Sequence, residues 1–127
     1  MDAYLTNKVT FTGNIDNVSE FLNAIDIIIM PSLYEGLPLT LVEQQANGLQ
    51  CIVSDMITKE ADKTGNLCFI SLNAPISEWV QAIESSNCKQ GREQRSKEAA
   101  CAIEKAGYCI QTEAKKLVEF YKSIFKN

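Results

Sequence analysis

The stretch of sequence that decides the fold is Ile27-Ile28-Ile29-Met30, which follows Asp26 and is stopped by Pro31. Four consecutive apolar residues, mostly β-branched, are typical of a strand that is buried on both faces. Such strands belong to parallel sheets, because the connecting helices cover both faces. The stretch therefore predicts an α/β domain built on a parallel sheet.

Strand and helix alternate outward from this stretch. Upstream, residues 9–13 predict a strand and a turn, and apolar residues at 18, 21, 22 and 25 predict a helix. Downstream, Asn47-Gly48 is a helix stop signal, and residues 55–66 are expected to be a loop with one helical turn. Further strands are expected at 51–54 and 67–70, and further helices at 38–46, 76–85, 93–105 and 108–125. The pattern predicts a single domain over residues 1–127, which is Rossmann-like and three-layered, with a parallel sheet of about four strands and C-terminal helices.

Composition excludes several functional classes. The net charge of −4 argues against nucleic acid as a partner, because a binder of phosphate backbones needs a basic face. Histidine is absent, which excludes Ser-His-Asp and Cys-His hydrolases within this chain and any zinc site that uses histidine. Without a signal peptide, the five cysteines are expected to be reduced in the cytoplasm, with Cys51 and Cys68 buried as small apolar residues.

The candidate site is the loop that follows residues 27–30, because ligands of open α/β sheets bind at the carboxyl ends of the strands. Glu35 precedes the expected turn, Gly36 permits a close backbone approach, and Glu43 lies inside the next helix. Backbone N–H groups at a helix N-terminus suit phosphates, whereas carboxylates suit hydroxyl groups. This order of groups matches a sugar nucleotide, in which a diphosphate separates two hydroxyl-bearing rings.

Spacing alone leaves two simpler explanations of the same residues open. In the first, Glu35 and Glu43 are ordinary solvent-exposed residues, as most glutamates are. Thr40 and Glu43 also fit a capping box at the helix N-terminus.

A family motif is similar to the run Pro31-Ser32-Leu33-Tyr34-Glu35-Gly36-Leu37-Pro38-Leu39-Thr40-Leu41-Val42-Glu43. The run resembles the Glu-x7-Glu motif of retaining, GT-B-fold glycosyltransferases of the glycosyl transferases group 1 family. Residues 9–13, 46–55 and 107–121 resemble the flanking segments of that family, the last of them in its bacterial exopolysaccharide and capsule members. The resemblance covers nearly the whole chain and identifies it as the C-terminal half of a GT-B fold.

The resemblance implies a role for each matching residue in hexosyl transfer from a nucleotide-diphosphate sugar. Glu35 is the expected catalytic residue and bonds hydroxyls of the transferred sugar, whereas Glu43 accepts hydrogen bonds from the ribose. Gly36, Leu37, Pro38 and Leu39 would bring backbone to the sugar and diphosphate, with Thr40 near the phosphates. Thr12 and Gly13 would lie near the base. The family uses no metal and no further cofactor.

The chain departs from the family pattern in ways that define its expected partners. It lacks the first strands of the domain, the arginine and lysine that clamp the diphosphate, and the N-terminal acceptor domain. That domain would belong to a full-length enzyme or to a separate subunit, so the chain alone is expected to be inactive. The expected location is the cytoplasm, at the inner face of the membrane in a full enzyme.

Two other functions stay open at this stage. The chain could be a non-catalytic Rossmann-like interaction module, in which an exposed sheet edge favours self-association. Sugar-nucleotide epimerases and phosphorylases share the architecture, but the epimerase chemistry would want a histidine that this chain lacks.

Overall fold

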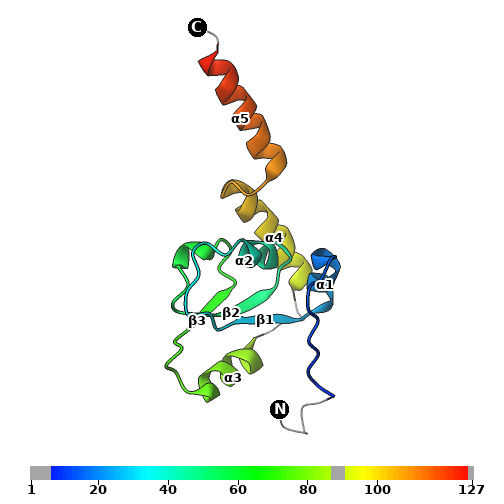
Figure 1. Cartoon of the computed structure of the whole chain (residues 1–127), viewed down its shortest axis with the longest axis vertical. Coiled ribbons are helices and arrows are strands. Elements are labelled where there is room, and N and C mark those ends of the chain that lie inside the picture. The colour runs from blue at the N-terminus through cyan, green and yellow to red at the C-terminus, as the bar shows by residue number, and fades with distance from the viewer. Residues whose placement is uncertain (1–6, 87–90, 126–127) are drawn as a thin grey trace.

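The computed structural model describes residues 7–86 and 91–125 as an α/β layered arrangement (Figure 1). Its strands β1 (Ile27–Met30), β2 (Gln50–Ser54) and β3 (Leu67–Ile70) form one parallel sheet in the order β1-β2-β3. The register pairs Ile28 with Cys51 and Cys51 with Leu67. The helices are α1 (Val18–Ala24), α2 (Leu39–Ala46), η2 (Lys59–Ala61, a 3-10 helix), α3 (Ile76–Ser85), α4 (Arg92–Lys105) and α5 (Ile110–Ile124).

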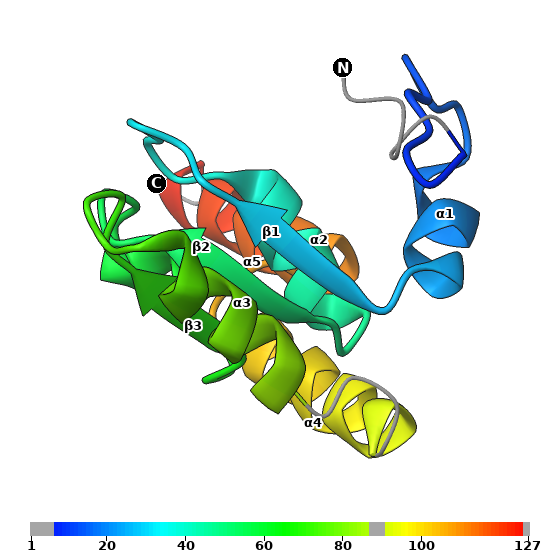
Figure 2. The same cartoon turned by 90° about the horizontal axis from the view of Figure 1, so that it is seen from below.

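Three layers are visible, as the sequence predicts. Helices α2 and α4 cover one face of the sheet and α3 covers the other (Figures 1 and 2). The principal core lies between the sheet and α2, where Leu41, Leu49, Cys51 and Val53 are completely buried. The α/β class with a parallel sheet is therefore confirmed.

The expected strand at residues 9–13 is wrong, and the sheet has three strands in the described residues rather than about four. A strand needs a neighbour with which to exchange backbone hydrogen bonds. In the Rossmann order 3-2-1-4-5-6, a third strand lies beside the second and not beside the fourth. In that order, the first and second strands lie between the third strand and the fourth. If residues 9–13 correspond to the third strand and β1 to the fourth, residues 9–13 need one of those strands as a partner. Residues 7–86 contain no strand before β1, so residues 9–13 stay irregular.

Strand β1 is less buried than its sequence suggests. Ile29 is 46% exposed and the other three residues of the strand are half-buried. Helix α3 packs mainly against β2 and β3, which leaves Ile29 of β1 open to solvent. Strand β1 is also an edge strand: in the described part of the chain, no strand lies beside the edge that faces away from β2.

Helix α4 is tied to the ends of α1 and α2 by side chains from its first turns. The Arg92 guanidinium donates to the carbonyls of Leu22 and Ile25, 2.7 Å away in the case of Ile25, and to both oxygens of Asn47. Ser96 Oγ donates to the Ala46 carbonyl at 3.1 Å. These bonds satisfy carbonyl groups that a helix C-terminus leaves without an internal partner.

Helix α5 extends away from the sheet beyond α4 (Figure 1). Its apolar side chains, expected to pack, are 51–59% exposed at Leu117, Val118, Phe120, Tyr121 and Ile124. No helix of the described residues has the length and apolar character needed to cross a membrane.

Candidate functional site

The loop after β1 carries most of the predicted site and lies at the carboxyl edge of the sheet, as expected. Glu35 is half-buried in this loop, whereas Gly36 and Leu37 are exposed. Pro38 is buried and takes an extended conformation at the N-cap of α2, with φ −73° and ψ 101°. The helix therefore begins one residue later than predicted, with Leu39 and Thr40 exposed in its first turn.

The N-terminus of α2 has no side-chain cap. The capping box between Thr40 and Glu43 therefore does not form, which removes that explanation of the two residues. The Leu41 N–H bonds the Pro38 carbonyl at 3.0 Å, whereas the preceding N–H groups of Leu39 and Thr40 have no partner inside the helix and are available to a ligand. They carry the positive end of the helix dipole, which favours an anion.

The carboxylates of Glu35 and Glu43 are both accessible, and neither has an ion-pair or hydrogen-bond partner in residues 7–86 and 91–125. The two ion pairs of the described residues lie elsewhere, at Lys97–Glu93 and Lys116–Glu113. Glu43 is exposed and borders a hollow of about 510 Å³, whose other lining residues come from α1, α2 and α4: Val18, Ser19, Leu22, Ala46, Asn47 and Ser96. Glu35 does not line this hollow.

Gly36 is not required by the packing of this chain. A Cβ placed on it would meet no atom within 4 Å, and its backbone is not in the left-handed region. The space beside the Gly36 Cα is therefore open, and the role of Gly36 in bringing backbone to a ligand stays a prediction.

Thr12 and Gly13 are not brought to the rest of the predicted site. Their segment lies on the side of α1, at the opposite end of β1 from the loop that holds Glu35 (Figures 1 and 2). Both residues are exposed, and Gly13 adopts a positive φ of 61°. Their role near a base stays a prediction.

Gln45 is a residue that the sequence analysis did not single out. Its side chain is completely buried, and its Nε2 donates to the carbonyls of Leu41 at 3.0 Å and Ala61 at 2.8 Å. Its Oε1 accepts from the Lys63 N–H at 2.9 Å and the Thr64 hydroxyl at 3.0 Å. The signal was available, because Gln45 stands one helical turn after Leu41 on the buried face of α2.

The cysteines differ in environment more than the sequence suggests. Cys51 is completely buried, as predicted, and burial raises the pKa of its thiol to about 12, with a smaller contribution from the charge of Asp62. The prediction for Cys68 is wrong, because this residue is exposed. Cys88 lies outside the described residues.

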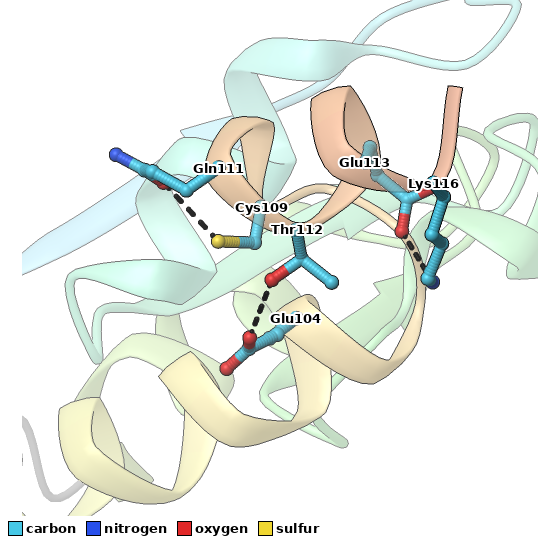
Figure 3. Close-up of polar contacts among 6 residues, drawn as sticks. All are labelled: Glu104, Cys109, Gln111, Thr112, Glu113 and Lys116. Atoms are coloured by element: carbon cyan, nitrogen blue, oxygen red, sulfur yellow. Dashed lines mark hydrogen bonds and ion pairs between the residues drawn. The ribbon is translucent and has the colours of Figure 1, made fainter. Parts of the chain in front are cut away.

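Cys109 is part of a polar cluster at the turn between α4 and α5 (Figure 3). Its thiol donates to Gln111 Oε1 at 3.2 Å, and the Thr112 hydroxyl donates to Glu104 Oε1 at 2.7 Å. Hydrogen bonds from the side chain and then the backbone of Thr112 lower the pKa of Cys109. The cluster lies away from the β1–α2 loop. Within residues 7–86 and 91–125, no three His, Cys, Asp or Glu side chains gather as metal ligands would.

Comparison with protein families places this geometry in context. A family model described as glycosyl transferases group 1 matches residues 1–86, which is more than half of the chain and includes both Glu35 and Glu43. The chain belongs to the glycosyl transferases group 1 family.

Curated members of the glycosyltransferase class resemble parts of the chain. It is 46% identical over 80 residues to "Putative glycosyltransferase EpsF" of Bacillus subtilis (strain 168), covering 62% of this chain and 21% of that protein. It is 35% identical over 69 residues to "UDP-Gal:alpha-D-GlcNAc-diphosphoundecaprenol alpha-1,3-galactosyltransferase" of Escherichia coli, covering 54% and 16% of the two proteins. It is 22% identical over 130 residues to "Lipopolysaccharide core biosynthesis mannosyltransferase LpsB" of Rhizobium meliloti (strain 1021), covering 98% and 36%.

The chain thus spans between 16% and 36% of the length of these three relatives. No solved structure matches it significantly.

Proposed function

We propose that this chain is the donor-binding C-terminal part of a retaining glycosyltransferase that takes its sugar from a nucleotide-diphosphate sugar. The observation that carries the proposal is the β1–α2 loop at the carboxyl edge of the sheet. There, the accessible carboxylate of Glu35 lies before a helix N-terminus that has no side-chain cap, and the accessible carboxylate of Glu43 lies one turn inside that helix. A ligand with hydroxyl groups at both ends and a diphosphate between them matches that order of groups.

Each group in the loop has a role that follows from its chemistry. The Glu43 carboxylate accepts hydrogen bonds from the ribose hydroxyls, and Glu35 accepts them from the transferred sugar. The N–H groups at the start of α2, at Leu39 and Thr40, stabilise the diphosphate, whose charge grows as it leaves. The helix dipole supplies this stabilisation without a metal ion.

The remaining parts of the reaction belong to a partner. The net charge of −4 opposes an anionic donor, so basic residues from elsewhere would raise the affinity of the site for the diphosphate. We propose that an N-terminal domain or a separate subunit supplies both those residues and the acceptor site. By the names of the relatives, polysaccharide or glycolipid biosynthesis is the proposed pathway class, with the enzyme in the cytoplasm at the inner face of the membrane.

Two glutamate substitutions test the donor site by separating the nucleotide from the sugar. Calorimetry would compare uridine diphosphate with UDP-glucose and UDP-galactose, and guanosine diphosphate with GDP-mannose. Glu43→Gln should weaken both the free nucleotide and the sugar donor about tenfold, because a charge-assisted hydrogen bond to the ribose is lost. Glu35→Gln should weaken only the sugar donor, because the free nucleotide has no group for it to contact.

Glu78→Gln is the matched control, because Glu78 is an exposed glutamate on α3, on the other face of the sheet. It should leave every affinity unchanged. If the wild-type chain bound none of these nucleotides or donors, the donor-site proposal would be wrong for this chain.

A second candidate function is a non-catalytic interaction module. The observation in its favour is the exposed apolar side of α5, together with the edge of β1 that no described strand covers. The same calorimetry distinguishes the two, because an interaction module would bind no sugar nucleotide.

A further inference from the structure

We propose that residues 55–64 form a second wall of the donor site, and that Gln45 is the positioning residue that holds this wall in place. The inference rests on the proposed donor function, since it names a further part of the same site.

The position of the wall follows from the sheet register. Met30 and Val53 are paired in the parallel strands β1 and β2. The chain therefore leaves the two strands side by side, at Pro31 and at Ser54. Because both segments leave the carboxyl edge, residues 55–57 begin next to the loop that carries Glu35.

The near end of the wall is fixed to the sheet. Ser54 is completely buried, and its Oγ accepts a hydrogen bond from the Met56 N–H at 3.0 Å. The Asp55 N–H donates to the Ile70 carbonyl of β3 at 2.9 Å. Ile57 is buried in the core, whereas Asp55 and Met56 remain exposed. The backbone that carries two exposed side chains is thus fixed at the edge where the donor would bind.

The far end of the wall packs in the core through Ala61 and is hydrogen-bonded to α2 by the side chain of Gln45. Its amide satisfies three groups of residues 61–64, namely the Ala61 carbonyl, the Lys63 N–H and the Thr64 hydroxyl. Because the amide is fully buried, replacing it by an apolar group would leave backbone groups of Ala61 and Lys63 without partners in the interior. Those groups would move toward water, and the wall would move with them.

Gln45 connects this wall to the donor helix. Helix α2 also carries Thr40 and Glu43, so one rigid element sets the distance between the wall and the groups proposed to bind the donor. A wall beside Glu35 faces the sugar end of the ligand rather than the nucleotide end. Loss of the Gln45 amide should therefore affect the sugar donor more than the free nucleotide.

The experiment uses Gln45→Met, which preserves length and helix propensity but removes the amide. We expect affinity for UDP-glucose, UDP-galactose or GDP-mannose, whichever the wild type binds best, to fall about tenfold, and affinity for the matching free diphosphate to fall less than twofold. Hydrogen exchange should show faster exchange at the Lys63 amide, because its acceptor is lost. Thr64→Val is a milder second variant that keeps the Gln45 amide and removes the bonds of the Thr64 hydroxyl to Gln45 Oε1 and to the Asn66 N–H. It should shift the same measurements in the same direction by a smaller factor.

Two controls separate positioning from general destabilisation. Gln44→Met makes the same chemical change one residue away, and Ile103→Val loosens the core at α4; neither should alter the ratio of donor to diphosphate affinity. Unchanged donor affinity in Gln45→Met and Thr64→Val, with wild-type binding intact, would overturn the wall and leave the donor site standing. Unaltered exchange at Lys63 in Gln45→Met would overturn the positioning role. A wild-type chain that binds no probe would overturn the donor site and the wall together.

Discussion

Cys51 shows how completely one side chain can be removed from water in a short chain. It lies between β1 and β3 in the sheet, and its side chain belongs to the core under α2. A thiolate in this position would lose its hydration and would also face the negative charge of Asp62, so the thiol pKa rises to about 12.

This shift predicts a loss of stability in alkaline solution. The folded state keeps the Cys51 proton up to a pKa of about 12, whereas the unfolded chain releases it near 9. The stabilisation is therefore fully present below pH 9 and is lost as the pH rises toward 12, with a slope of at most about 1.4 kcal/mol per pH unit. Urea unfolding over this range should show a weaker pH dependence in Cys51→Ala than in the wild type, and equal slopes would contradict the prediction.

Cys51 and Cys68 also show what a sequence can predict about a residue. Both stand in short apolar runs, and both were expected to be buried. Cys51 lies on the central strand with α2 above it, so the prediction holds. Cys68 lies on the edge strand β3 at a position that α3 leaves open to solvent, and composition gives no sign of which strand is at the edge.

At the scale of elements, the joint between α2 and α4 depends on Gly48. This residue adopts φ 75°, and its N–H bonds the Gln45 carbonyl at 2.8 Å as α2 ends. A Cβ there would lie 2.7 Å from the backbone oxygen of Arg92 and 2.8 Å from the backbone nitrogen of Ser96. The absence of a side chain at Gly48 lets the first turns of α4 approach the end of α2.

Two glycine substitutions should therefore have opposite effects, one on the free energy of unfolding and the other on donor affinity. Gly48→Ala should lower the free energy of unfolding by about 1–3 kcal/mol, because it adds backbone strain and forces α4 away. Gly36→Ala should change it by less than about 0.5 kcal/mol, because the methyl group meets no neighbour. Gly36→Ala should instead weaken sugar-donor binding. Denaturant titration and calorimetry on both variants would check the pair, and a strongly destabilised Gly36→Ala would show that the open space at the loop is misassigned.

The elements themselves were largely predictable, because hydrophobic periodicity and stop signals are local. Strand β3 and helix α3 have the predicted bounds, and Asn47-Gly48 ends α2 as expected. The strand prediction for residues 9–13 is wrong because strand formation does not depend on local sequence alone. A β-branched run forms a strand only where a neighbouring strand pairs with it. The loop at the carboxyl edge could be predicted from topology, whereas Gln45 and its partners depend on contacts across 16 or more residues.

At the scale of the whole molecule, α5 is the element least supported by the rest. An isolated helix of about 12–15 residues is marginally stable in water, and tertiary packing normally supplies the difference. Helix α5 has 15 residues, and its apolar side chains are about half exposed.

Limited proteolysis should therefore remove α5 first. Trypsin should cut earliest after Lys105, Lys115 or Lys116, around the turn and the first half of α5, and mass spectrometry should recover a fragment that retains the sheet. Arg95 and Lys97 provide an internal control, because α4 is held there by Ser96 and by the buried Ala99. First cleavage at Lys59 or Lys63 would contradict both this order and the rigidity of residues 55–64.

The contacts of Arg92 also bear on the order of events during synthesis. Its guanidinium reaches back 70 residues to Leu22 and 67 residues to Ile25. The ribosome releases α1 long before it releases the side chain that holds the end of α1 in place. Leu22 in the core cluster and the bond from Asn47 Nδ2 to Asn23 Oδ1 can hold α1 before α4 emerges, because their partners are synthesised earlier. The bonds to the carbonyl groups at the end of α1 form last, when α4 supplies Arg92.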